Sequence, residues 1–297
     1  MIEWTPFELA TARPFGIARW THSSYGRVRV QWTLDGLTGC GEAALNAFYG
    51  ETPQTVLAVL PLLAEAAGTD PWAFRALAAG RPVRELLGLP AGPLPESSFT
   101  VGLGPVEEMA GAARAAVEWG HRILKGKLGT ARDEAILEAL RVDASAAWTR
   151  PQAQRMLGVL AVCGVELLEQ PLAADDLEGH TQLRRRSPLP IIADESLHSV
   201  RSMGALAGSF DGVNLKLAKL GGPLQALRAL ELARDLHLGV MLGCMVESSL
   251  GIAAALPLAP LCDWADLDSP LLLAHNPCRG CAGRAVSWKG PLAPAGA

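Results

Sequence analysis

Short apolar runs alternate with segments of helical periodicity through most of the chain after residue 98. Eight of these runs have the length and composition of strands, and a helical segment follows most of them. Strands that alternate with helices form a parallel sheet, and eight such units close into a barrel. The predicted strands are residues 98–103, 122–127, 141–145, 165–169, 189–194, 212–217, 239–245 and 262–267.

Residues 1–96 follow a different pattern. Residues 27–34 alternate in the manner of a strand, and an Asp-Gly turn signal leads from them into a second strand. Residues 52–67 then predict a helix that Thr52 caps and that has a proline at its first position. We therefore expect an α+β lobe here, and we expect the Gly/Pro-rich tail 276–297 to return to it.

The composition indicates a globular protein. The 297 residues are 49% apolar and 19% charged, which predicts a sizeable core rather than disorder. A net charge of −4 gives no basic surface for nucleic acid. Residues 238–262 are long and apolar enough to suggest a membrane span, but Glu247 interrupts them, and we predict a buried strand followed by a helix instead. Neither nucleic acid nor a membrane is therefore expected as a partner.

The N-terminus and the cysteines indicate the compartment. The first residues lack the basic start and the apolar block of a signal peptide. Six cysteines in such a chain are expected to be reduced thiols of a cytoplasmic protein. Cys278 and Cys281 form one CxxC motif without a second pair, so we interpret them as loop thiols, with metal or redox chemistry as the alternative.

Three consecutive predicted strands end on a charged residue, namely Glu169, Asp194 and Lys216. An ionised group at the end of a buried strand is costly unless it is paired, binds a metal or takes part in chemistry. In barrel enzymes the catalytic groups lie at these carboxyl ends of the strands. The three residues are therefore candidates for one functional site.

Side-chain alternation along the strands adds further residues to this site. Lys125 and Lys127 share a face of their strand, and Asp143 follows on the next strand. Lys219 has the opposite parity to Lys216 and precedes a Gly-Gly turn. We therefore interpret Lys216 as the functional lysine and Lys219 as a surface residue.

The charges of this set suggest a chemistry. Three carboxylates on adjacent strands, without a histidine, form a hard, oxygen-rich site suited to Mg²⁺. Lysines on both sides of the metal suggest proton transfer at a carbon beside a bound carboxylate, with the metal stabilising the enediolate. Burial and neighbouring positive charge are expected to lower the pKa of such a lysine toward neutrality. The alternative is a set of structural ion pairs at the mouth of the barrel.

These motifs resemble those of the enolase superfamily, muconate-lactonising subgroup, over residues 13–273. The resemblance implies an α/β fold with a modified (β/α)7β TIM barrel over 97–275. It also implies an N-terminal α+β capping domain over 1–96, which the tail 276–297 completes, and a Mg²⁺ cofactor. The matching residues are the KxK motif Lys125 and Lys127, the metal ligands Asp143, Glu169 and Asp194, and the sixth-strand base Lys216.

Within the subgroup the chain is most similar to the dipeptide epimerases. Asp266 and Asp268 match a DxD motif that in those enzymes binds the α-ammonium group of the substrate. The resemblance implies that Lys127 and Lys216 act on opposite faces of the α-carbon of the C-terminal residue. One lysine removes the proton and the other returns it, while Lys125 supports the carboxylate. The expected protein is an isomerase with a dipeptide as substrate, and a homo-oligomer remains open.

Other enzyme classes stay open on the same residues. An o-succinylbenzoate synthase or N-acyl amino acid racemase would use the same lysines and metal without needing Asp266 and Asp268. A Schiff-base aldolase would use Lys216. Residues 75–82 and 128–142, like the C-terminus, are shorter than is usual in the family, which leaves a metal-binding relic with little turnover as a further alternative.

The preference for a particular dipeptide is expected to depend on residues 16–26, which the resemblance implies to be a loop that closes over the substrate. Arg19 in this segment is a candidate partner for an acidic substrate side chain, and Trp20 or Tyr25 could cover an apolar one. A solvated loop position is the alternative for Arg19.

Overall fold

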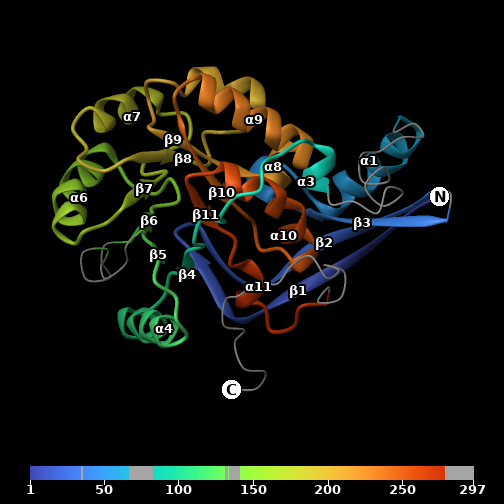
Figure 1. Cartoon of the computed structure of the whole chain (residues 1–297). Helices are drawn as coiled ribbons and strands as arrows, with labels where there is room; N and C mark the ends of the chain where they lie inside the picture. The colour runs from blue at the N-terminus through green and yellow to red at the C-terminus, as the bar shows by residue number, and fades with distance from the viewer. Residues whose placement is uncertain (35, 67–82, 131–132, 134–140, 278–297) are drawn as a thin grey trace.

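A computed structural model of the chain describes residues 1–34, 36–66, 83–130, 133 and 141–277 (Figure 1). Its larger sheet consists of β4 (Phe99–Val101), β5 (Leu124–Lys127), β6 (Arg141–Asp143), β7 (Leu167–Glu169), β8 (Ile191–Ala193), β9 (Gly212–Lys216), β10 (Gly239–Gly243) and β11 (Trp264–Asp266). These eight strands are ordered β11-β10-β9-β8-β7-β6-β5-β4, and each neighbouring pair is parallel. Ser97, just before β4, forms a parallel bridge with Ala265 of β11, which closes the sheet into a barrel.

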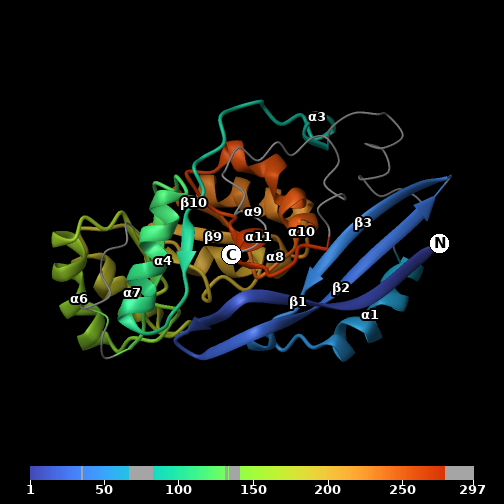
Figure 2. The same cartoon turned by 90° about the horizontal axis from the view of Figure 1, so that it is seen from below.

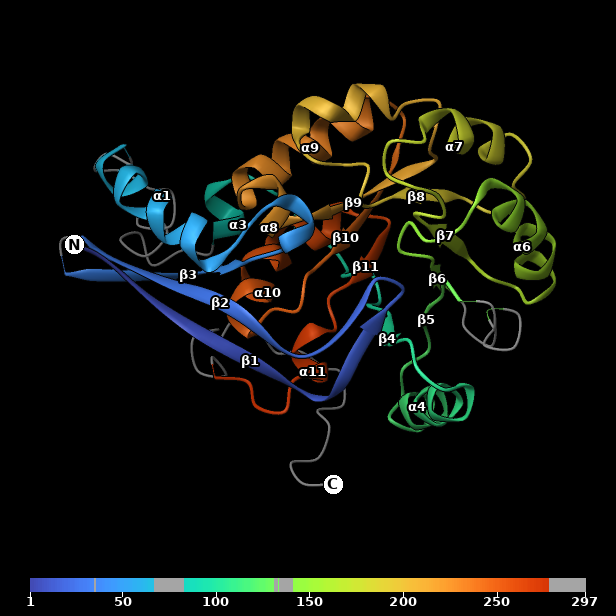
Figure 3. The same cartoon turned by 180° about the vertical axis from the view of Figure 1, so that it is seen from behind.

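The predicted parallel barrel is thus confirmed, and each strand lies inside its predicted range. Figures 1 and 3 show α6, α7 and α9 around the outside of the barrel. A continuous apolar core fills the space between them and the strands; Val142, Ile191 and Val213 are among its fully buried residues. The helical segments after β4 are α4 (Val106–Glu118), α6 (Arg150–Val162), α7 (Leu177–Arg184), η2 (Val200–Ala205), α8 (Leu217–Leu220), α9 (Pro223–Asp235), α10 (Ser249–Ala255), η3 (Leu256–Leu261) and α11 (Ser269–Leu272).

Local sequence signals set the ends of several of these helices. Thr149 and Gln152 form a capping box at the start of α6, in which each side chain accepts from the backbone N–H of the other residue. Gly221 ends α8 with a φ of 89°, a left-handed conformation that favours glycine. Pro223 then opens α9 at the first helical position, where its missing N–H costs nothing.

The N-terminal part is a three-stranded antiparallel sheet with the order β1-β2-β3. The predicted helix begins at Pro53, and the side chain of Thr52 accepts the backbone N–H of Thr55, as expected of a cap. The two predicted strands, the turn signal between them and the helix are therefore confirmed. The elements are β1 (Ile2–Ile17), β2 (Trp20–Leu34), β3 (Leu37–Ala44), η1 (Ala47–Tyr49), α1 (Pro53–Ala66) and α3 (Val83–Leu86).

The prediction of a loop over residues 16–26 is wrong. Ile17 pairs with Trp20, so the segment is the tip of a long β1–β2 hairpin (Figure 2). The loop was implied by the resemblance, but backbone pairing between β1 and β2, which residues 16–26 alone do not reveal, holds the segment in a hairpin. The hairpin contains an irregularity between Ala10 and Phe15, where the register shifts.

Two contacts attach this sheet to the barrel beyond the end of β10. The Arg27 Nε atom donates to the backbone oxygen of Val246 at 2.7 Å. The Glu42 carboxylate accepts the backbone N–H of Ser248 at 3.0 Å, and also its hydroxyl. Because Ser248 caps α10, the sheet is fixed to the start of a barrel helix.

Residues 238–262 form β10, α10 and η3, which confirms the predicted strand and helix in place of a membrane span. No helix among the described residues is long and apolar enough to cross a membrane. Residues 75–82, most of 128–142 and the tail with Cys278 and Cys281 lie outside the described residues. The domain bounds and the cytoplasmic location stay predictions.

Candidate active site

The register of the barrel brings the predicted site residues to one edge. Lys127 pairs with Asp143 across β5 and β6, and Asp143 pairs with Glu169 across β6 and β7. Lys216 and Asp266 are both paired with Gly243, on either side of β10. Since all eight strands run in the same direction, these residues meet at the carboxyl end of the barrel.

Asp143, Glu169 and Asp194 form a buried acidic cluster. Each offers a carboxylate oxygen, and these atoms lie within 4.8 Å of one another. All three side chains are almost fully buried, so water cannot stabilise their charges. Three hard oxygen donors at this spacing fit a divalent cation such as Mg²⁺. The cluster could therefore hold a metal ion.

Lysines face this cluster from two sides. The Lys125 Nζ atom lies 2.6 Å from Glu169 Oε2 and 3.3 Å from Asp143 Oδ2. Lys127 donates to Asp143 Oδ2, and the Lys216 Nζ atom lies 2.6 Å from Asp194 Oδ2. Each carboxylate of the cluster is thus paired with at least one ammonium group.

The charges shift the pKa values of the cluster in different directions. Burial raises the pKa of Asp143, but Lys127 and Lys125 outweigh it, and the net pKa lies below the ordinary value. Burial and the neighbouring charge of Asp143 raise the pKa of Glu169 to about 7. Burial also raises the pKa of Asp194, but the charges of Lys216 and, to a smaller extent, Lys219 bring that pKa well below the ordinary value.

The expected lowering of the pKa of Lys216 is wrong for this arrangement. Burial does lower that pKa, but the charges of Asp194 and Glu169 more than compensate, and the net pKa is raised. The same balance raises the pKa of Lys125, which burial lowers and Asp266 raises. The neighbouring carboxylates therefore outweigh desolvation, which is the opposite of the order that the sequence suggested.

The interpretation of Lys219 as a surface residue is also wrong. Only 1% of its side chain is exposed, and its Nζ atom lies 2.5 Å from Asp194 Oδ1 and 2.7 Å from Asp194 O. The strand β9 ends at Lys216, and the helix α8 begins at Leu217. Strand parity therefore no longer applies at Lys219, and a helical step of three residues turns it back toward the face of Lys216.

Asp266 and Asp268 lie across the mouth from the acidic cluster. Asp266 accepts hydrogen bonds from Ser98 Oγ at 2.6 Å and from Lys125 Nζ at 2.8 Å. Asp268 accepts the backbone N–H of Thr100 at 2.5 Å, and burial together with the charge of Asp266 raises its pKa to about 7. Both side chains are buried, so they are not a solvated pair.

Arg19 reaches from the hairpin to the barrel. Its Nη2 atom lies 2.6 Å from Glu195 Oε1, and its Nη1 atom donates to the backbone oxygen of Ser145. Its guanidinium also lies 5.0 Å from the ring centre of Trp20 and 4.6 Å from that of Phe48. Arg19 is therefore paired with barrel residues, although the residue as a whole remains exposed.

Sequence reasoning missed two buried residues of this region. Glu195 follows Asp194 directly, and its parity gave it no place on the inner face, yet it is buried and paired with Arg19. Asn214 donates to Glu169 Oε1 at 2.7 Å. Strand alternation already places Asn214 on the same face as Lys216, but no further sequence signal assigned it to the site.

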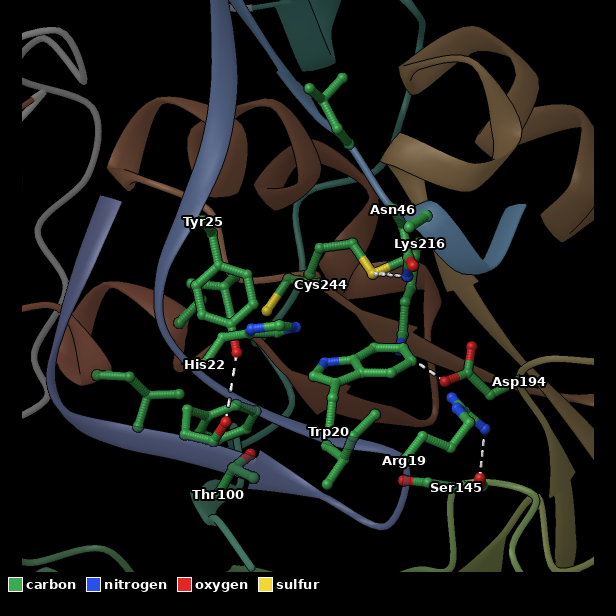
Figure 4. Close-up of a pocket in the computed structure, with 18 of the residues that line it drawn as sticks. Arg19, Trp20, His22, Tyr25, Asn46, Thr100, Ser145, Asp194, Lys216 and Cys244 are labelled. Atoms are coloured by element: carbon green, nitrogen blue, oxygen red, sulfur yellow. Dashed lines mark hydrogen bonds and ion pairs between the residues drawn. The ribbon is translucent and has the colours of Figure 1, made fainter. Parts of the chain in front are cut away.

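A cavity of about 370 Å³ lies between the barrel and the hairpin. Figure 4 shows Lys216 and Asp194 of the barrel on one side of it and His22 and Tyr25 of the hairpin on the other, with Trp20 between them and Arg19 beside Asp194. Its wall also includes Lys125, Lys127, Asp266, Asp268, Tyr25 and Tyr49. The cavity thus has a charged floor from the barrel strands and a largely aromatic side from the hairpin.

Residues 108–275 match the family model described as "Enolase C-terminal domain-like". The chain belongs to the enolase superfamily. It is 35% identical to the L-Ala-D/L-Glu epimerase of Escherichia coli (strain K12), over 88% of this chain and 90% of that protein. It is also 35% identical to the hydrophobic dipeptide epimerase of Roseobacter litoralis, over 94% and 93% of the two chains.

A solved structure of a dipeptide epimerase has a similar fold. The dipeptide epimerase of Enterococcus faecalis V583, complexed with Mg and the dipeptide L-Leu-L-Tyr, matches with a TM-score of 0.86 and 28% identity. The match covers 93% of this chain and 92% of that chain. The resemblance to dipeptide epimerases is therefore confirmed.

Proposed function

We propose that this protein is a Mg²⁺-dependent dipeptide epimerase, an isomerase that inverts the α-carbon of the C-terminal residue. The observation that carries the proposal is the placement of Lys127 and Lys216. They stand on β5 and β9, and the three strands between them lead to Asp143, Glu169 and Asp194. Two ammonium groups therefore flank one acidic cluster, as a two-base proton transfer requires.

Asp143, Glu169 and Asp194 would hold the metal. A divalent cation bound there supplies positive charge beside the substrate carboxylate, which makes the neighbouring α-proton more acidic. The buried, closely spaced oxygens support this assignment, as does the Mg complex of the similar enzyme from Enterococcus faecalis.

Lys127 and Lys216 would move the proton, one on each face of the α-carbon. A lysine held protonated by Asp194 can donate a proton at once. The same lysine can accept a proton only where the charge of its carboxylate partner is compensated. Lys125, which contacts Glu169 and Asp266, would stand beside the substrate carboxylate and neutralise it.

Asp266 and Asp268 would bind the α-ammonium group of the dipeptide. Asp266 is paired with Lys125, but Asp268 is buried beside it with no lysine or arginine partner among the described residues, and a second buried carboxylate favours a cationic ligand. This observation favours a dipeptide over the N-acylated substrates of an o-succinylbenzoate synthase or N-acyl amino acid racemase, which carry no free ammonium group.

Arg19 remains a proposed substrate contact. It lines the cavity, but its guanidinium is already paired with Glu195. An acidic substrate side chain would have to compete with that carboxylate, whereas an apolar one could pack on the rings of Trp20 and Tyr25.

Deuterium exchange at the α-carbon tests the proposal. Dipeptides with varied C-terminal residues are incubated with the protein in D₂O, with Mg²⁺ or with a chelator, and the exchange is followed by NMR. We expect exchange at the α-carbon of the C-terminal residue with Mg²⁺ and none with the chelator. Exchange that survives the chelator would contradict the metal-dependent mechanism, and Mg²⁺ binding without exchange of any dipeptide would indicate a metal-binding relic.

A further inference from the structure

Lys219 makes both of its hydrogen bonds to one residue. Its Nζ atom donates to Asp194 Oδ1 and to Asp194 O, at 2.5 and 2.7 Å. The other carboxylate oxygen of Asp194 accepts from Lys216 Nζ. One carboxylate is therefore held by two lysines, one on each oxygen.

The fold buries Lys219 at this point. The helix α8 turns the chain directly after β9, and its last residue is followed by Gly221, whose N–H closes the turn on Leu217 O. The ring of Tyr49 in η1 covers the ammonium group from the other side, with its centre 5.9 Å from Nζ. A buried ammonium is costly unless its N–H donors are satisfied, and Asp194 accepts two of the three here.

Asp194 is also held along its backbone. The Gln170 Oε1 atom accepts the backbone N–H of Asp194 at 2.9 Å, while Lys219 donates to its backbone oxygen. With Lys219 on Oδ1 as well, the backbone and the carboxylate are fixed by the same side chain. Protein side chains alone therefore fix the orientation of the Asp194 carboxylate.

We propose that Lys219 is a positioning residue of the metal site, which orients the Asp194 carboxylate for Mg²⁺. The inference rests on the proposed function in one respect, namely that this site binds Mg²⁺. It predicts that the loss of Lys219 weakens Mg²⁺ binding, which is the opposite of what simple electrostatics predicts. Removal of a positive charge beside the ligands would strengthen cation binding if charge alone mattered, whereas the loss of an orienting group weakens it.

Isothermal titration calorimetry with Mg²⁺ on the whole chain shows whether the loss of Lys219 strengthens or weakens binding. The variant Lys219→Met removes the donor and the charge at similar length, and Lys219→Arg keeps both. We expect Lys219→Met to raise the Kd for Mg²⁺ about 10- to 100-fold, the usual range for lost ligand-orienting groups, and Lys219→Arg to stay nearer the wild type. A Kd that is unchanged or lower in Lys219→Met would overturn the proposal.

Lys216→Met is the matched comparison, because it removes the donor on the other oxygen of the same carboxylate. Lys216 contacts only the side chain of Asp194, whereas Lys219 also holds its backbone oxygen. We therefore expect Lys216→Met to bind Mg²⁺ with a Kd within about threefold of the wild type and to lose α-proton exchange for one epimer of the dipeptide at every Mg²⁺ concentration. Lys219→Met should instead need more Mg²⁺ for half-maximal exchange and regain most of the wild-type rate at saturation. Thermal unfolding in chelator checks that both variants fold.

Failure of the inference and failure of the proposed function give different results. If the wild type binds Mg²⁺ but exchanges no dipeptide, the epimerase assignment is wrong, and the Kd values of the two variants still test Lys219. If Lys219→Met binds Mg²⁺ like the wild type but shows no exchange at saturation, Lys219 does not act through the metal site. If the wild type binds no Mg²⁺, both proposals are wrong.

Discussion

The barrel strands and the β1–β2 hairpin line the same cavity, but their side chains differ in charge and in burial. The barrel side presents buried carboxylates and lysines whose positions are fixed by strand register. The hairpin side presents Trp20, His22 and Tyr25, which are partly or largely exposed. Charged groups that are already paired suit proton transfer, and exposed rings suit the recognition of a side chain. We infer that chemistry and substrate choice are carried by different parts of the fold.

The largest expected effect comes from the barrel side. Lys127→Ala and Lys216→Ala should each lower epimerisation about 10²- to 10⁴-fold, because each removes one proton-transfer group. Because the two lysines are proposed to act on opposite faces of the α-carbon, each variant should retain exchange for one epimer of the substrate and lose it for the other. NMR of the separate epimers in D₂O measures this. Loss of the same epimer in both variants would contradict opposed bases.

The next effect concerns the substrate ammonium. Asp268→Asn keeps an oxygen that can accept the Thr100 N–H but removes the negative charge. We expect kcat/KM for a dipeptide to fall by about 30-fold or more, as for other desolvated charge pairs. The same dipeptide with an acetylated N-terminus is the control, since it has no ammonium to lose. An equal loss for both substrates would mean that Asp268 acts through the fold.

The junction between the two regions contains Glu247, which is buried between two residues that bind the N-terminal sheet. Burial raises its pKa to about 7, although the hydrogen bond from the Met245 backbone N–H lowers that pKa. Of the charges around it, Glu42 raises this pKa further, while Arg27 and Lys216 lower it. Because the folded state binds the proton more tightly than the unfolded chain, Glu247 adds stability at low pH that is lost as the pH rises through about 7.

Urea unfolding between pH 5 and pH 8 measures this contribution. Relative to Glu247→Gln, the wild type should lose about 3 kcal/mol over the interval from the ordinary glutamate pKa to 7. Glu231→Gln is the control, since Glu231 is exposed on α9 and should leave the pH dependence unchanged. A pH dependence that is the same in Glu247→Gln and the wild type would show that Glu247 does not bind a proton in this range.

The sequence predicts the barrel side well for a physical reason. Each buried strand is short and ends on one charge, so alternation alone places residues such as Glu169 and Asp194 on a common edge. Alternation stops at the end of a strand, which is why it misplaced Lys219. Arg19 and Glu195 are 176 residues apart and pair across two separate sheets, so no local pattern could join them. The predicted direction of the Lys216 pKa shift was wrong for a related reason. That shift depends on which carboxylates lie near the lysine in the fold.

The smallest expected effect lies on the hairpin side and tests substrate choice. Arg19 is occupied by Glu195, so the wild type should prefer a dipeptide with an apolar C-terminal residue, such as Ala-Leu, over Ala-Glu. Glu195→Gln removes the competing charge and should raise the ratio of kcat/KM for Ala-Glu to that for Ala-Leu about 2- to 5-fold, the size of a partly exposed ion pair.

Arg19→Met is the matched variant for this prediction, because it removes the guanidinium while keeping an extended side chain against the rings of Trp20 and Phe48. In the double variant with Glu195→Gln, the gain for Ala-Glu should disappear, since no cation remains to be released. If the gain persists without Arg19, the added activity comes from the change of charge beside Asp194. Substrate choice would then depend on the barrel as well as the hairpin, and the separation of the two regions would be incomplete.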